Sequence, residues 1–232
     1  MFHGKMKAVT FSYDDGTTQD KRLIKMFNRY GLKATFNINS ELCGTPNSLI
    51  REGVTVAHCR PRAEEISDSY QGHEVAVHTL RHLNLTRQTD ADVIRFVEED
   101  RIALSKMVGY EVVGMAYPCG GENNNDHVAR LIREHTGVAY SRTITSNGSF
   151  ELQDNLYRFN PTVYHVHFDE MFELGRQFLA LKPDRPQLFY IWGHAFEFDI
   201  DDSWDRMDAF CQMISGHEDI FYGTNRDVLL GE

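Results

Sequence analysis

Two histidines four residues apart carry the clearest chemical signal in this sequence. His78 and His82 enclose Thr-Leu-Arg, and imidazoles at this spacing can contact one metal ion when the local structure turns both toward it. Asp14 and Asp15 form an adjacent carboxylate pair about sixty residues earlier. Two imidazoles and one carboxylate make a facial site for a divalent ion and leave positions open for water. We therefore predict Asp15 as the third ligand, with Asp14 free to act as a base.

The elements that would position these side chains alternate along the chain between strand-like and helix-like patterns. Strands are predicted at residues 7–13, 33–39, 73–78, 112–118, 138–144, 157–166, 187–194 and 219–223. Helices are predicted at residues 17–31, 61–72, 89–110, 124–137, 171–182, 202–215 and 225–230, with Asp90 as the N-cap of the longest. This alternation favours an α/β fold, a compact (β/α) barrel in preference to an open doubly wound sheet.

The bulk composition narrows the classes of function. The 232 residues, 41% of them hydrophobic, suit one domain spanning residues 1–232. A net charge of -10 argues against nucleic acid as a partner, and no apolar run is long enough to cross a membrane. The start lacks the charged and apolar pattern of a leader, so we expect a cytoplasmic protein. The four cysteines are scattered, which is typical of reduced thiols.

Further polar residues fall at the ends of predicted strands. Arg142 lies near the end of one strand, His194 ends another, and Pro118 with Cys119 ends a third. In a (β/α) barrel these carboxyl ends meet at one mouth, where active sites lie. Taken singly, each feature has a simpler explanation as a turn, a surface pair or a core histidine. Their joint occurrence at equivalent strand ends favours one functional pocket.

At these residues the sequence resembles the polysaccharide deacetylase family with the NodB homology domain, carbohydrate esterase family 4. Ser-Tyr-Asp-Asp-Gly at residues 12–16 resembles the T-F-D-D-G motif of that family. Residues 72–82, Gly-His-Glu-Val-Ala-Val-His-Thr-Leu-Arg-His, are similar to the longer and more specific G-H-E-[IV]-x-x-H-[ST]-x-x-H motif. Residues 118–120 resemble the end of R-x-P-Y-G, and residues 192–194 the late Leu-x-His motif.

The resemblance implies a single-domain, distorted (β/α)₇ barrel that hydrolyses an N- or O-acetyl group on a carbohydrate or another acylated small molecule. It implies that Asp15, His78 and His82 bind zinc or another divalent transition metal, and that Asp14 is the general base. His194 would be the general acid. Tyr190 and Trp192 would line the acetyl pocket, and backbone near Pro118 and Cys119 would bind the oxyanion.

Three departures from the family pattern bear on the site. Ala116 stands where the R-x-P-Y motif has the arginine that holds the base, and Cys119 replaces its tyrosine. The only D-x-x-W sequence, at residues 201–204, follows His194, whereas the family motif precedes the late histidine. Asp14 still needs a cation to orient it and keep it ionised. We therefore hypothesise that Arg142 replaces the missing arginine from another strand.

Two other classes of function remain open from the sequence. A two-histidine, one-carboxylate site also suits a non-haem iron oxygenase, although that chemistry needs neither Asp14 nor His194. The lost arginine is also compatible with a carbohydrate-binding protein whose deacetylase site has degenerated. A cysteine nucleophile at Cys119 is disfavoured, because the metal route already supplies a nucleophile.

Overall fold

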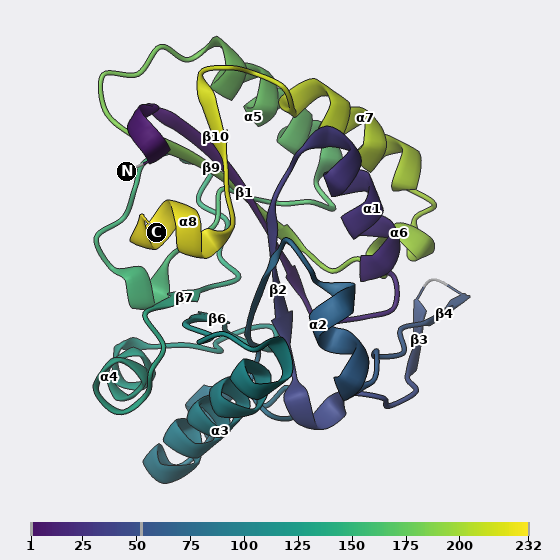
Figure 1. The fold of residues 1–232 in the computed structure, drawn as a ribbon, viewed down its shortest axis with the longest axis vertical. Helices are drawn as coiled ribbons and strands as arrows, with labels where there is room; N and C mark the ends of the chain where they lie inside the picture. The colour runs from purple at the N-terminus through teal and green to yellow at the C-terminus, as the bar shows by residue number, and fades with distance from the viewer. Residues whose placement is uncertain (1, 52, 232) are drawn as a thin grey trace.

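The computed structural model describes residues 2–51 and 53–231, and a curled sheet of parallel strands forms its centre (Figure 1). The strands are β1 (Lys7–Asp14), β2 (Ala34–Ile38), β5 (Glu74–Val77), β6 (Gly114–Ala116), β7 (Tyr140–Arg142), β8 (Val163–Tyr164), β9 (Gln187–Gly193) and β10 (Ile220–Tyr222). Seven of them follow the order β7-β6-β5-β2-β1-β9-β8, and β10 pairs with the start of β1. The structure confirms the predicted distorted (β/α)₇ barrel.

The edge strands of this curled sheet are β7 and β8. An isolated parallel bridge joins Arg142 of β7 to Phe159, just before β8, and so narrows the gap between the two edges. All strand pairs in the main sheet are parallel, so the carboxyl ends of β1, β5, β6, β7 and β9 lie at the same end of the barrel.

Helices cover the outside of the sheet. They are α1 (Asp20–Tyr30), α2 (Ile66–Ser69), α3 (Asp90–Val108), α4 (Asp126–His135), α5 (Phe168–Ala180), α6 (Glu197–Ile200), α7 (Trp204–Ile214) and α8 (Asn225–Leu230). Helix α7 packs between α1 and α5 along one flank, and α3 packs against α4 on the other side (Figure 1). No helix within residues 2–51 and 53–231 is both long and apolar enough to span a membrane.

The packing explains why β1 forms the centre of the molecule. All eight of its residues are buried, as expected for a strand covered on both faces. Phe11 packs against Phe27 of α1 and Phe210 of α7, with ring centroids 4.7 and 6.4 Å away. This aromatic contact fixes the strand that ends in the two aspartates, so the hydrophobic core also positions the candidate site.

Local structure differs from the sequence predictions at several places. The predicted strand at residues 157–166 is reduced to the two residues of β8. The predicted helix at residues 61–72 is reduced to a 3-10 turn (Ala63–Glu65) and the single turn of α2. Residues expected to form a loop instead contain an antiparallel pair, β3 (Ser48–Arg51) and β4 (Val54–Ala57). The N-cap of α3 is Thr89, whose hydroxyl accepts the backbone N–H of Asp92; Asp90 is already helical.

Candidate active site

The turn after β1 separates two neighbouring carboxylates. Asp14 is the last residue of the strand, whereas Asp15 has φ 76° and Gly16 has φ 58°. Glycine is required at position 16, since an added Cβ would lie 3.0 Å from the Ile38 side chain in a left-handed backbone conformation. The strained turn therefore gives Asp14 and Asp15 different surroundings although they are adjacent in sequence.

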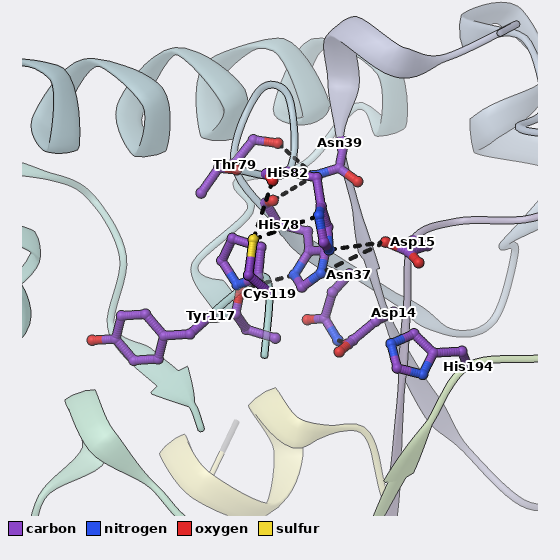
Figure 2. A network of polar contacts seen from close by, with 12 residues as sticks. Asp14, Asp15, Asn37, Asn39, His78, Thr79, His82, Tyr117, Cys119 and His194 are labelled. Atoms are coloured by element: carbon purple, nitrogen blue, oxygen red, sulfur yellow. Dashed lines mark hydrogen bonds and ion pairs between the residues drawn. The ribbon is translucent and has the colours of Figure 1, made fainter. Parts of the chain in front are cut away.

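Asp15, His78 and His82 converge as the sequence predicted. One ligand atom from each lies within 4.8 Å of the other two. The Oδ1 atom of Asp15 is 3.8 Å from Nε2 of His78 and 3.4 Å from Nε2 of His82 (Figure 2). That oxygen is buried and has no hydrogen-bond partner among the described residues. A buried carboxylate oxygen facing two imidazole nitrogens fits a divalent ion held by these three side chains.

Hydrogen bonds fix the orientation of His78. Its Nδ1 lies 2.9 Å from the carbonyl oxygen of Ala116, so Nδ1 carries the proton and Nε2 is free to bind a metal. Burial is the largest influence on this imidazole and lowers its pKa to about 4, which keeps it neutral at physiological pH. A neutral imidazole whose second nitrogen is already bonded is the form required of a metal ligand.

The backbone around His78 is held by two buried polar side chains. Asp100 of α3 accepts the backbone N–H groups of Ser40, at 2.8 Å, and of His78, at 3.1 Å. Asn39 donates to the carbonyl oxygens of His78 and Thr79 (Figure 2). Carboxylate and amide together tie the ends of β2 and β5 to each other and to α3. Neither residue was identified from the sequence, because no local pattern links them to the histidines.

Arg142 lies at Asp14, where the sequence hypothesis placed it. Its Nη2 atom is 2.5 Å from both oxygens of Asp14, and the two side chains are 0% and 2% exposed. Asn37 of β2 donates a further hydrogen bond of 2.8 Å to Asp14 Oδ1. Burial alone would raise the pKa of Asp14, but the Arg142 guanidinium, together with His78 and His194, outweighs burial and lowers that pKa. The carboxylate is therefore ionised and held in one orientation, although Ala116 cannot contact it.

His194 has a carboxylate partner that the sequence analysis missed. Glu197, at the start of α6, accepts from His194 Nδ1 at 3.1 Å and from the neutral His165 Nε2 at 3.0 Å. The Tyr164 hydroxyl also donates to Glu197, and Arg51 of β3 forms an ion pair with it at 3.3 Å. Glu197 is 4% exposed. The His-x-x-Glu spacing was visible at residues 194–197, but nothing in it distinguished this glutamate from an exposed one.

The charges around His194 favour its protonated form. Burial would lower the pKa of this imidazole, but the nearby carboxylates of Glu197, Asp15 and Asp14 outweigh burial and raise the pKa to about 9. Burial likewise opposes ionisation of Glu197, yet the positive charge of His194 and the hydrogen bonds from both imidazoles hold its pKa well below the usual range. His194 is thus poised to donate a proton at neutral pH.

These groups open into one pocket with a volume of about 420 Å³. Its lining residues are Asp14, Asp15, His78, His82, Tyr117, Cys119, Gly120, Ile144, Tyr164, Trp192 and His194. Of the predicted substrate-binding residues, Cys119 and Trp192 line the pocket. Pro118 and Tyr190 do not: Pro118 is buried, and the ring of Tyr190 packs against Phe159 in the barrel interior. Tyr190 shares the face of β9 with Trp192 but lies two residues further from the carboxyl end of the strand, so it is below the pocket wall.

Cys119 is a wall residue rather than an activated nucleophile. It adopts φ 70°, and its thiol donates to the carbonyl oxygen of His82 at 3.4 Å. Burial raises the pKa of this thiol, so little thiolate forms at neutral pH. His82 Nδ1, at 3.8 Å from the sulfur, is its nearest basic group in the hydrogen-bond network.

Comparison with known proteins places the chain in a family. It belongs to the polysaccharide deacetylase family, whose model matches residues 3–140. A comparison with curated proteins gave no match.

Solved structures share the fold at low sequence identity. PuuE allantoinase has a TM-score of 0.66 and 12% identity, over 95% of this chain and 87% of that one. A family 4 carbohydrate esterase from Streptomyces lividans, solved with acetate, has a TM-score of 0.57 and 13% identity, over 95% and 92%. The Streptococcus pyogenes deacetylase PplD, also with acetate, has a TM-score of 0.51 and 19% identity; the match covers 64% of this chain and only 61% of that one.

Proposed function

We propose that this protein is a metal-dependent hydrolase that removes an acyl group, acetyl in the simplest case, from an amino sugar or another acylated carbohydrate. The observation that carries the proposal is the placement of Asp15, His78 and His82 around one point beside the Asp14–Arg142 pair. His194, which lines the same pocket, completes a set with one base and one acid. Membership of the polysaccharide deacetylase family supports this reaction class.

Asp15, His78 and His82 would hold zinc or a similar divalent ion. Such an ion supplies a Lewis acid for the acyl carbonyl and lowers the pKa of bound water. Asp14 takes a proton from the attacking water, and Arg142 keeps its carboxylate ionised and correctly oriented. The water oxygen bonds to the acyl carbon, and we assign the backbone N–H of Cys119 to the oxyanion.

His194 completes the reaction on the leaving group. As the carbon–nitrogen bond breaks, the protonated imidazole gives its proton to the amine nitrogen, because an amide anion is a poor leaving group. Glu197 holds Nδ1, so Nε2 is the nitrogen left to donate. The products are a carboxylic acid and a free amine, and the two proton transfers balance.

Two variants and a metal titration test this proposal. Purified protein would be stripped with a chelator, reloaded with zinc, and assayed for carboxylic acid release from N- and O-acylated sugars. We expect release only after reloading, and no stoichiometric binding of zinc by Asp15→Ala or His78→Ala. Asp205→Ala, which removes an exposed carboxylate on α7, is the matched control and should bind zinc normally. Full zinc occupancy in both ligand variants would refute the metal site.

The two alternative functions make different predictions in the same experiment. A degenerate carbohydrate-binding protein would bind sugar without releasing acid. The Asp14–Arg142 and His194–Glu197 pairs argue against it, because both reactive groups have the partners they need. A non-haem iron oxygenase would consume oxygen with iron, and it would have no use for the base and acid found here.

A further inference from the structure

The pocket is larger than an acetyl group requires. A water molecule takes about 30 Å³, so the three heavy atoms of an acetyl group need less than about 100 Å³. The pocket volume is about 420 Å³. The remaining space is filled by another part of the substrate, and the chemistry of the pocket wall indicates which part that is.

The side-chain donors on the pocket wall that take no part in the reaction already have partners inside the protein. The Tyr117 hydroxyl donates to the carbonyl oxygen of Tyr157 at 2.8 Å, and the indole N–H of Trp192 donates to Ser146 Oγ at 3.3 Å. The Tyr164 hydroxyl donates to Glu197. Sugar hydroxyls placed against this wall would lose water and gain few hydrogen bonds in return, which is costly. The wall instead suits apolar groups.

The segment after β7 gives this wall its shape. Arg142 lies against the Trp192 ring, with Cζ 4.7 Å from its centroid, and Ser146 holds the indole nitrogen. Ile144 lies between these two anchors and lines the pocket half-buried. Tyr164 stacks on Trp192 with centroids 4.2 Å apart, and Trp192 is only 6% exposed. Trp192 therefore offers no open ring face for stacking on a sugar, and Ile144, which lines the same pocket, presents an aliphatic surface.

Cys119 adds to the room in the pocket next to His82. It lines the pocket where the R-x-P-Y-G motif has tyrosine, and a thiol is much smaller than a phenol. Its thiol also donates to the His82 carbonyl oxygen, so the Cys119 side chain directs no hydrogen-bond donor at the acyl chain. Together with Ile144 and Tyr117, it bounds a space beside the metal ligands that is wide and mainly apolar.

We propose that the site accepts acyl groups larger than acetyl, namely apolar chains of about four to six carbons, and that Ile144 determines this preference. The inference rests on the proposed hydrolysis and specifies its substrate class. The chemistry is unchanged: water adds to the acyl carbon, the bond to nitrogen breaks, and the longer carboxylic acid leaves with the free amine. Each additional buried CH₂ raises kcat/KM about fourfold, so butanoyl exceeds acetyl by more than about tenfold.

A series of acyl lengths on one amine tests the proposal. The zinc-loaded full chain would be assayed on N-acetyl-, N-butanoyl- and N-hexanoylglucosamine, and binding of acetate and hexanoate would be measured by calorimetry. We expect kcat/KM to rise along the series and hexanoate to bind more tightly than acetate. An acetyl substrate that is hydrolysed fastest, or equal affinity for the two acids, overturns the proposal but leaves the proposed hydrolysis intact. Acid release from none of these amides and from none of the matching O-acyl sugars overturns both.

A substitution at Ile144 tests the residue assignment separately. Ile144→Trp fills the space beside Trp192, so it should lower the butanoyl-to-acetyl ratio of kcat/KM by about tenfold or more. Ile102→Trp, on the outer face of α3 where the side chain is 41% exposed, is the matched control and should leave the ratio unchanged. Zinc binding by both variants would show that they are folded. An unaltered ratio in Ile144→Trp overturns the assignment.

Discussion

The glutamate beside the proposed general acid gives the sharpest prediction about mechanism. Glu197→Gln keeps the shape of the side chain and an oxygen that can accept from His194 Nδ1, but it removes the negative charge. The charge of Glu197 is the largest influence raising the pKa of His194 to about 9. Losing it should bring that pKa down toward the ordinary value of about 6.5, while the charges of Asp14 and Asp15 retain part of the effect.

The expected magnitude follows from the fraction of His194 that carries the acidic proton. With a pKa of about 9, roughly nine-tenths of the imidazole is protonated at pH 8. If the variant has a pKa near 7, only about one-tenth is protonated at that pH. The rate of amide hydrolysis at pH 8 should then fall about tenfold, whereas at pH 6 it should change less than about twofold. The variant loses rate at high pH and not at low pH, because the raised pKa of His194 is what keeps the imidazole protonated at high pH.

The measurement is a pH profile of kcat/KM between pH 5 and pH 10 on an amide substrate. We expect the basic limb of Glu197→Gln to move down by about two pH units, with the acidic limb in place. An activated ester needs less help from the acid, so its profile should respond less. Glu218→Gln removes an equal charge at an exposed loop position and is the control. If the basic limb does not move, His194 is not the acid or Glu197 does not set its pKa.

Three further variants test the other groups in the pocket. Asp14→Asn should bind zinc normally and lose about 10²–10⁴-fold in rate, as measured by steady-state assay; near-normal turnover would exclude Asp14 as the base. Arg142→Ala leaves a buried carboxylate unpaired, so it should raise the pKa of Asp14 and move the acidic limb of the pH profile to higher pH. For the same reason it should reduce the free energy of unfolding, measured in urea, by about 3–5 kcal/mol. An acidic limb that does not move would contradict the pairing. Cys119→Ser should retain activity, whereas a trapped acyl-enzyme in the parent would contradict this expectation.

The barrel and the convergence of Asp15, His78 and His82, the proposed metal ligands, were predictable because they depend on short-range patterns. Alternation of strand-like and helix-like segments fixes the parallel topology, and the carboxyl ends of parallel strands must meet. Asp15 and His78 each follow a buried strand, so their convergence followed from the fold class alone. Arg142 could be placed for the same reason, since it ends β7.

The residues that sequence reasoning missed act through contacts with no sequence signature. Glu197 is one of many glutamates, and only the fold of α6 places it beside His165, about thirty residues earlier. Asp100 sits on a helix face whose other members are apolar, and its role depends on two strand ends being presented to it. Tyr190 and Trp192 lie on the same face of β9, yet only Trp192 lines the pocket, because it is two residues nearer the carboxyl end of the strand.

Two of the three departures from the family pattern, the missing arginine and the displaced D-x-x-W sequence, have a common physical explanation. A general base needs a nearby cation and a general acid needs a nearby anion, but neither requirement specifies which element supplies the partner. At the mouth of a barrel several strand ends and their following loops lie within reach of the same point. Arg142 reaches Asp14 from β7 although position 116 on β6 is alanine. Glu197 reaches His194 from the first turn of α6, the helix that follows β9. The absence of a motif residue therefore indicates a loss of chemistry only after the neighbouring strand ends have been searched for a replacement.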